Sequence, residues 1–476
     1  MSKKIRIDNF LRMSPDDPEF STRKPNYLIA GANPTYYLDT ANIQEVQSAP
    51  LASSLNWAQI SASLDGNIIS MCSGQGVYPV YIMTTTSRVY GITTAGGLPT
   101  GVTSLGFPTG SSVTLDYNDG DMTWVNNQLY VTYSGAGYLV YRYNSGSWSS
   151  IASSNTAYQS CLEPFLQYCM YSNFGTIKKI DPSYSVLTGV SLGSGWNIYS
   201  MRNYNNKYLA IAAANGTNYT QNYIHLWNGY DSLPNYSVKI NGQFIDMKVV
   251  DGTLYVAAAI STGATVLYYL SGTELKESIS PQYSSIDQVG AFYANVRPNS
   301  CFSYLQQIGI RLMDTSDLVA PLMVYGKGLD GGVAEFIISS GFDIYGNIVG
   351  SDGNQYGFHG SSLYYYPISS NSYQPILYKS KWIPVKNLSG IDIIYDTPPQ
   401  TGTDAINVTI YGKGEDIISG NSATALTSIT PTTTLNNTRT RLDVQGFAGD
   451  KCSIVLSTVN TGVWRPIIRA IELITE

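Results

Sequence analysis

Short runs of alternating apolar and polar residues recur through the middle of the chain, separated by turns rich in Gly, Asn and Asp. Each unit has an Asn or Asp-Gly turn, a short strand ending in aromatic residues, a Gly-rich turn and a second Tyr-rich strand. Alternation with a period of two predicts β-strands, and these turns favour hairpins between them. The units begin at Asp65, Asn126, Pro164, Asn205, Asp251, Asn299 and Gly346.

The spacing of these units predicts a propeller. Apart from a longer first interval, successive units start about 40–50 residues apart, which matches one four-stranded blade per unit. A single hairpin cannot bury both of its faces, whereas stacked blades cover one another and the ring leaves no long exposed edge. We therefore predict an all-β fold with a β-propeller of about seven blades over residues 51–374. A large β-sandwich or a β-helix is the alternative, although β-helix repeats are normally much shorter.

The two flanks differ from the repeats. Residues 1–50 contain five prolines and are predicted to form an extended arm. Within them, "NIQEVQSAP" from Asn42 is predicted to be a strand that closes the first or last blade. Residues 375–476 hold a series of short antiparallel strands, from "ILYKSKWIPV" to "IIRAIELI". This series predicts a jelly-roll-like C-terminal β-sandwich.

Composition supports an all-β protein and excludes several other classes. Charged residues are only 13% of the chain, whereas 39 Tyr and 44 Gly are present. Coiled coils and charged disorder need many more Lys, Glu and Arg. The net charge is −6, and residues 29–374 alone carry 12 basic and 20 acidic groups. An acidic middle part argues against a groove that follows nucleic-acid phosphates, so we expect no nucleic-acid partner.

Cysteine usage and the N-terminus indicate where the chain folds. Five cysteines are widely spread and form no Cys-x-x-Cys pair. We expect free, mostly buried thiols, as in a reducing cytoplasm, with a Cys161–Cys169 bridge as the alternative. The basic start lacks the apolar segment of a secretory signal, and no run approaches 18 apolar residues. We therefore expect no membrane insertion.

Catalytic motifs are scarce. The chain has only two histidines, His225 and His359, and no Gly-x-Ser-x-Gly elbow, so both histidines are expected to be structural. We expect no metal site, no cofactor and no catalytic residue. A pair of facing carboxylates could still hydrolyse a glycoside, because such residues need no fixed sequence spacing. Candidates for that role are Asp116, Asp119, Asp121, Asp246 and Asp314.

One segment contains two weak motifs. "NDGDMTW", from Asn118 to Trp124, resembles part of a sialidase Asp-box, but Asp121 stands where that motif has Gly, and the motif occurs once. "DYNDGD", from Asp116 to Asp121, groups oxygen ligands that suit calcium, but it lacks the spacing of an EF-hand loop. We interpret it as a hydrated turn.

Aromatic residues provide a second kind of candidate site. Exposed aromatic rings on loops can stack on sugars or contact proteins, whereas buried rings belong to the blade core. Strand alternation alone does not distinguish the two. The candidate glycan or partner contacts are Tyr138, Trp148, Trp227, Tyr230, Tyr365 and Trp464.

The two ends carry a family resemblance. "IDNFLRMSPDDPEF" near the N-terminus, "YKSKWIPV" at the start of the predicted sandwich and "WRPIIRAIELITE" at the C-terminus resemble the β-propeller proteins of tailed-bacteriophage virions. That family includes tail nozzle, tail tip and connector-associated proteins. The resemblance implies a non-catalytic structural role in the tail of a virion assembled in the host cytoplasm. It also implies docking to other tail or connector proteins, with several copies in a ring.

Two other functions share the predicted fold. The first is a propeller adhesin that binds a receptor or glycan on the host surface. The second is a propeller glycosidase, which would need two facing carboxylates at the centre of the ring, one of them with a raised pKa.

Overall fold

The computed structural model divides the chain into two compact units, one of residues 57–320 and 343–367, the other of 1–56, 321–342 and 368–476. The structure describes residues 3–7, 28–30, 51–52, 58–61, 64–116, 120–133, 139–153, 161–215, 221–259, 265–279, 301–304, 307–311, 322–325, 345–366, 376–379, 383–400, 402–413, 422–431, 438–445, 447, 449–459, 464 and 466–475.

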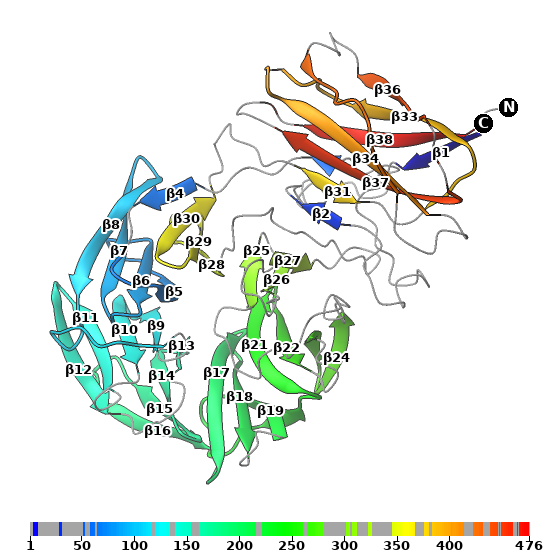
Figure 1. Cartoon of the computed structure of the whole chain (residues 1–476). Helices are drawn as coiled ribbons and strands as arrows, with labels where there is room; N and C mark the ends of the chain where they lie inside the picture. Colours follow the sequence, from blue (N-terminus) through cyan, green and yellow to red (C-terminus); the bar gives the residue numbers. More distant parts are fainter. Residues whose placement is uncertain are drawn as a thin grey trace. The chain divides into compact units, whose positions relative to one another are not determined.

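Seven antiparallel sheets follow one another along the chain and form the blades of a propeller (Figure 1). Blade 1 is β5–β8 (Ile68–Ser73, Val80–Thr84, Val89–Ala95, Leu98–Gly106). Blade 2 is β9–β12 (Gly120–Val125, Gln128–Tyr133, Leu139–Asn144, Ser147–Ser153). Blade 3 is β13–β16 (Leu162–Phe165, Tyr168–Asn173, Thr176–Ile180, Val186–Ser191). Blade 4 is β17–β20 (Trp196–Tyr204, Tyr208–Asn215, Gln221–Trp227, Tyr236–Lys239).

The remaining blades complete the series. Blade 5 is β21–β24 (Gln243–Val250, Thr253–Ala259, Thr265–Ser271, Glu274–Ile279). Blade 6 has three strands in the described part, β25–β27 (Cys301–Tyr304, Gln307–Arg311, Leu322–Tyr325). We assign β27 to blade 6 by its pairing with β26, although its residues cluster with the other unit. Blade 7 is β28–β30 (Tyr345–Val349, Gln355–His359, Ser362–Tyr366) with β4 (Ala58–Ser61).

The ring closes in two ways. The first strand of each blade contacts the first strand of the next, and β28 of blade 7 contacts β5 of blade 1. In addition, the outer strand of blade 7 comes from the other end of the propeller sequence, because β4 pairs with β30 in the register Leu363↔Ser61. Two distant segments of the chain thus share one sheet, and this sheet joins the start of the propeller to its end.

Apolar side chains from neighbouring blades fill the space between them. One cluster combines Ile211 and Trp227 of blade 4 with Phe165 and Ile177 of blade 3. Equivalent buried clusters lie between blades 4 and 5, 7 and 1, 1 and 2, and 2 and 3. Because both faces of each sheet face a neighbour, its strands carry apolar residues on both sides, as repeats that stack require.

The other unit holds two antiparallel sheets, each with a buried face, which together make a β-sandwich. Sheet A has the order β1-β38-β33-β36 with β3 on β38 (Lys3–Ile7, Ile467–Thr475, Leu388–Tyr395, Arg439–Asp443, Leu51–Ala52). Sheet C has the order β2-β31-β37-β34-β35 with β32 on β37 (Leu28–Ala30, Leu377–Lys379, Lys451–Val459, Ala405–Lys413, Ser422–Ala425, Ile383–Pro384).

The fold confirms the prediction of an all-β chain with a propeller of about seven blades and a C-terminal sandwich. Two details differ from the sequence-based expectation. Residues 3–7 and 28–30, expected in an extended arm, are strands of sheets A and C, since β1 pairs with β38 and β2 pairs with β31 at Leu377–Lys379. The blade-closing strand is β4 at Ala58–Ser61, whereas the segment from Asn42 lies outside the described residues.

Candidate functional site

A three-residue motif recurs in the inner strands of four blades. The motif consists of Ser or Asp, then Met, then a residue that varies between blades. Its four copies are Ser70-Met71-Cys72, Asp121-Met122-Thr123, Ser200-Met201-Arg202 and Asp246-Met247-Lys248. Each methionine is buried in a core cluster between blades. Because side chains alternate along a strand, the residues before and after Met share the opposite face. The motif therefore gathers polar and charged groups where the inner strands of the ring meet.

Asp121 and Asp246 have the same role in blades 2 and 5. Asp121 Oδ1 accepts a hydrogen bond from the Met122 N–H at 2.8 Å, and Oδ2 accepts from the Leu162 N–H of blade 3 at 2.9 Å. Asp246 Oδ1 accepts from the Met247 N–H at 2.8 Å, and Oδ2 accepts from the Cys301 N–H of blade 6 at 2.9 Å. Each carboxylate thus fixes the first residue of the next inner strand.

Arg202 of blade 4 lies between two of the acidic residues. Its Nη1 is 3.9 Å from Glu163 Oε2 of blade 3, and its Nη2 is 3.6 Å from Asp246 Oδ1 of blade 5. The guanidinium also donates to the Met247 carbonyl from Nε and to the Met201 carbonyl from Nη1. Glu163 Oε1 accepts from the Asn203 N–H at 2.9 Å. Blades 3, 4 and 5 are therefore joined through one guanidinium.

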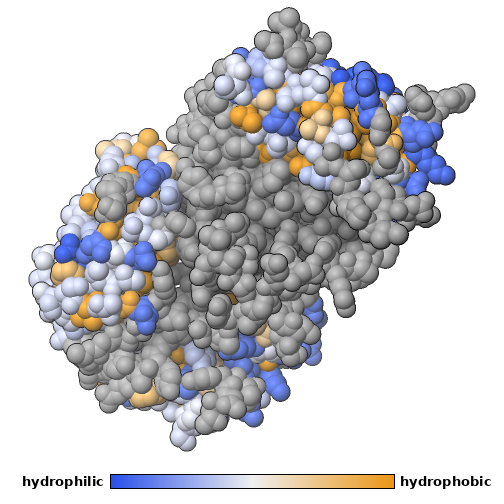
Figure 2. Space-filling view, viewed as in Figure 1, coloured by the Kyte–Doolittle hydropathy of each residue, from blue (hydrophilic) through white to orange (hydrophobic). Residues whose placement is uncertain are grey.

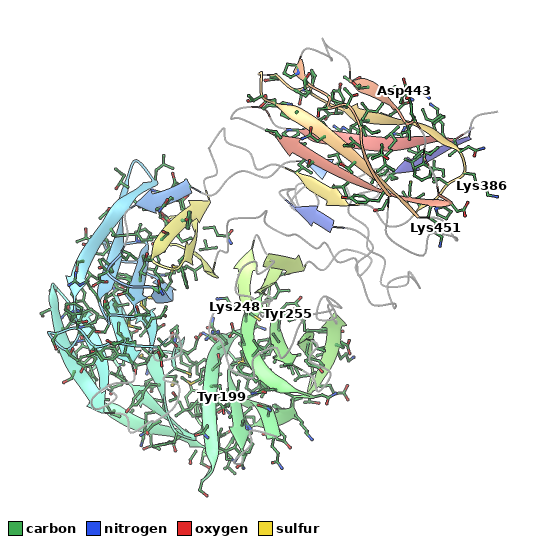
Figure 3. The ribbon with its side chains drawn as sticks, viewed as in Figure 1. Tyr199, Lys248, Tyr255, Lys386, Asp443 and Lys451 are labelled. Carbon is green, nitrogen blue, oxygen red and sulfur yellow. The ribbon has the colours of Figure 1, made fainter. Side chains whose placement is uncertain are left out.

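Burial shifts the protonation of this cluster. It raises the pKa of Glu163 to about 7, because desolvation outweighs the attraction of Arg202. It also raises the pKa of Asp121 and of Asp246, against the opposing effect of Arg202. The pKa of Lys248 is lowered by burial and by nearby Arg202. Figure 3 labels Lys248 on β21. Burial thus raises the pKa of all three carboxyl groups of the cluster, that of Glu163 to about 7.

The hydrogen bonds decide what this cluster can do. A carboxyl group with a pKa near 7 has the acidity that a general acid needs. However, one oxygen of Glu163 accepts a backbone N–H and the other pairs with Arg202. Asp121 and Asp246 likewise have both oxygens occupied by backbone donors. The arrangement therefore acts first as a set of ties between blades.

The described residues hold no group of three or more His, Cys, Asp or Glu side chains suited to a metal ion. All five cysteines are free, so the alternative Cys161–Cys169 bridge is not formed. Burial raises the pKa of the Cys161 thiol, which keeps it protonated.

Of the carboxylates proposed from sequence, Asp119 and Asp314 lie outside the described residues, as does the centre of the "DYNDGD" turn. Among the described residues, no helix is long and apolar enough to cross a membrane.

The candidate aromatic residues fall into different environments. Trp227 is fully buried and donates from Nε1 to the Asp231 carbonyl, and Trp464 is buried as well, which corrects their proposed role in surface contacts. Trp148 is half-buried and donates to the Leu105 carbonyl. Tyr365 packs against the cluster between blades 7 and 1. Tyr138 lies outside the described residues.

Of the candidates within the described residues, Tyr230 is the one that is open to solvent, with 77% of its surface exposed. It lies in the β19–β20 loop, where Asn228 Oδ1 accepts hydrogen bonds from the N–H groups of Tyr230 and Asp231. Asp231 Oδ2 in turn accepts from the side-chain amides of Asn228 and Asn235. The ring of Tyr230 is thus presented on a loop that is held by its own side chains.

The central cluster was not predicted from the sequence as a unit. Asp121 and Asp246 were named as candidates, but Glu163 and Arg202 were not. The recurring Ser/Asp-Met pair was the available signal, because it marks the same position in four repeats. Its meaning becomes clear only from the register, which shows a β-bulge just before Ser70, Ser200 and Asp246.

No family model matches this chain, and no curated protein matches it. Among solved structures, a catalytically inactive virginiamycin B lyase from Staphylococcus aureus with quinupristin is 10% identical, covering 66% of this chain and 98% of that one, with a TM-score of 0.47. The Neurospora crassa Pan2 WD40 domain is 9% identical, covering 67% and 97%, with a TM-score of 0.44. The mitotic checkpoint complex gives 12% identity, 69% and 98% coverage and a TM-score of 0.45. The propeller assignment rests on the sheet order and ring closure described above, and this fold is consistent with a binding or protein-interaction role.

Proposed function

We propose that this chain is a non-catalytic structural component of a bacteriophage tail, acting through protein docking. The observation that carries the proposal is that the carboxylates at the centre of the ring bind backbone N–H groups of the next blade. A site that turns over substrate needs polar groups free to meet it. Here those groups hold the blades in register, which is what a rigid spacer or ring element requires.

The ends of the chain support the same role. The first described strand, β1, pairs along its whole length with the last strand, β38. The propeller is closed in a comparable way by β4 on β30. Each pairing joins segments that are far apart in the sequence, and this opposes local unfolding of the paired strands. A part of a virion that must persist outside a cell benefits from this construction.

The place in the tail follows from the resemblance at the two ends of the chain. The proposed partners are neighbouring tail or connector proteins and further copies of this chain in a ring. The protein would be made in the host cytoplasm and then built into the virion. The low charge of the chain suits extended protein contacts, because the cores of interfaces are depleted of charged residues.

Immunogold electron microscopy tests this location. Antibodies raised against the purified chain are applied to phage particles from the sample that contains its gene, with antibodies absorbed on the purified chain as the control. We expect gold at one fixed position on the tail. Label on bacterial surfaces, with unlabelled particles, would contradict the proposal.

A second candidate function, glycan binding, is favoured by the exposure of Tyr230. An aromatic ring fixed on a loop can stack on a sugar ring. The test is saturable binding of host polysaccharide by the wild type and by Tyr230→Ala, with Tyr236→Ala, at the start of strand β20 directly after this loop, as the matched control. Tyr236 is 45% exposed and packs edge-on against Tyr208. Loss of binding in Tyr230→Ala alone would support this function, and equal binding by all three proteins would exclude it.

A further inference from the structure

Blade 3 differs from its neighbours in the residues that it places in left-handed turns. At the turn between the first two strands, blades 2, 4 and 5 use Asn126, Asn205 and Asp251, residue types that tolerate a positive φ. Blade 3 has Leu166 at this position, with a φ of +56°. A branched apolar side chain is disfavoured there, and Leu166 is nevertheless 40% exposed. Such strain is most often retained where it serves a function.

The same blade exposes further apolar groups. On its outer strand β16, Val186 is 43% and Leu187 is 41% exposed. Leu166 in turn touches the loop of blade 4, since its Cδ1 would be only 2.9 Å from a Cβ placed on Gly229. That loop carries Tyr230 and Leu233, with 77% and 66% of their surfaces exposed. We call these five residues the blade 3 surface: Leu166, Val186, Leu187, Tyr230 and Leu233.

The edge of the sheet is open at this surface. Strand β16 is the last in the order β13-β14-β15-β16, so one row of its backbone groups has no partner strand among the described residues of the propeller. No charged residue occurs from position 182 to 201. The outer strands β8 and β12 of blades 1 and 2 are also uncharged, whereas those of blades 4 and 5 carry Lys239 in one case and Glu274, Lys276 and Glu277 in the other. Charged side chains protect an edge from pairing, and β16 has none.

These observations indicate which kind of partner would bind the blade 3 surface. Four of the five side chains are aliphatic, which fits a protein partner and gives little to a sugar. The side chains of β16 itself carry no charge that would repel an identical strand across a twofold axis, and the Lys178 ammonium of β15 is held on this strand by a 3.0 Å hydrogen bond to Thr188 Oγ1. We propose that the blade 3 surface is a self-association site, at which β16 pairs antiparallel with β16 of a second copy of this chain.

In the paired state, the two four-stranded sheets become one continuous sheet, and Leu166 and Tyr230 of each copy flank the joint. The inference builds on the docking role proposed above and names its surface and its partner. Figure 2 shows apolar residues among hydrophilic ones on the visible surface of the propeller. Strand β8 of blade 1 is likewise an uncharged edge strand with one exposed apolar residue, Leu98. The blade 3 surface differs in having two exposed aliphatic residues on the edge strand itself, Val186 and Leu187, together with the left-handed Leu166 and the exposed loop of blade 4.

Sedimentation of the purified full chain over about a hundredfold range of concentration tests this proposal. We expect a reversible dimer, and we expect Leu187→Lys to weaken it at least tenfold. The matched control is Ser150→Lys, which adds the same charge to the exposed outer strand of blade 2. We expect this variant to dimerise as the wild type does. A wild type that stays monomeric, or equal effects of the two lysines, would overturn the proposal.

A second variant separates association from folding. Leu166→Asn restores the residue type that blades 2 and 4 use in this turn, so we expect an unchanged or higher melting temperature together with a weaker dimer. A lower melting temperature with unchanged dimerisation would show that Leu166 serves packing against the Gly229 loop, and would overturn its assignment. These measurements use the protein alone in solution. Their failure would therefore leave the proposed location in the tail to be decided by immunogold labelling.

Discussion

Arg6 and Glu472 stand opposite each other in strands β1 and β38, and Arg6 Nη1 lies 2.8 Å from Glu472 Oε1. Glu472 also pairs with Lys4 at 3.4 Å and with Arg439 at 2.9 Å. Its side chain is only 9% exposed, whereas the three cations around it are about half exposed. One nearly buried carboxylate therefore holds the first strand of the chain to the last.

Removing this charge should loosen β1. We expect Glu472→Gln to lower the free energy of unfolding of the sandwich by about 1–3 kcal/mol, because three charge-assisted contacts are lost. Hydrogen exchange at residues 3–7, followed by mass spectrometry, should speed up. The control is Asp443→Asn, which removes a 78% exposed carboxylate from the same sheet and should change stability by less than about 0.5 kcal/mol. Equal effects of the two variants would contradict this role of Glu472.

Asp246 should be among the most sensitive positions of the propeller. Asp246→Ala leaves the Cys301 N–H without its acceptor and removes a counter-charge from Arg202, so we expect a loss of about 2–4 kcal/mol in chemical denaturation. Asp246→Asn keeps one acceptor oxygen and should cost less. The control is Glu277→Ala on the exposed outer strand of the same blade, with a change within about 0.5 kcal/mol. If Asp246→Ala lowers the free energy of unfolding no more than this control does, Asp246 does not join blade 5 to its neighbours.

His225 should make the propeller sensitive to acid. Burial lowers its pKa to about 4, its Nδ1 lies 2.7 Å from Ser237 Oγ, and its Nε2 is buried without a hydrogen-bond partner. The unfolded chain binds this proton near pH 6.5 and the folded chain only near pH 4. Its contribution to stability is therefore complete above pH 6.5 and is lost as the pH falls toward 4, by up to about 3 kcal/mol.

The measurement is the free energy of unfolding from pH 7.5 to 4 in the wild type and in His225→Gln. The variant cannot take up this proton, so its curve should fall less steeply on the acid side. Parallel curves would show that His225 does not contribute.

Protonation of Glu163 should raise the free energy of unfolding on acidification, opposite to the effect of His225. Its pKa is raised to about 7 in the folded chain, so the folded state takes up a proton at a pH where the unfolded carboxyl is still ionised. Acidification from pH 7 toward 4.5 therefore adds stability through this group. We expect Glu163→Gln, which keeps an acceptor for the Asn203 N–H, to lose that gain. The same titration in a His225→Gln background isolates the effect, and an unchanged slope there would rule it out.

The sequence was sufficient for the propeller because each repeat carries its own strand and turn signals. It was not sufficient for pairings between distant segments: nothing local in "KKIRI" indicates that it pairs with "IELIT" of strand β38. Burial was also ambiguous, since Trp227 and Tyr230 are three residues apart and only the latter is exposed. The central cluster depends on β-bulges that change which face a residue occupies, and strand alternation alone does not reveal them.

The pairing of β1 with β38 also sets the order in which the protein can be completed on the ribosome. The propeller can close once residue 366 has emerged, because β4 then has its partner strand β30. Sheet A lacks β38 until residue 475 is made. Strands β1, β3 and β33 all pair with β38. A chain that lacks β38 would therefore carry a finished ring but a sheet A without the strand that β1, β3 and β33 share.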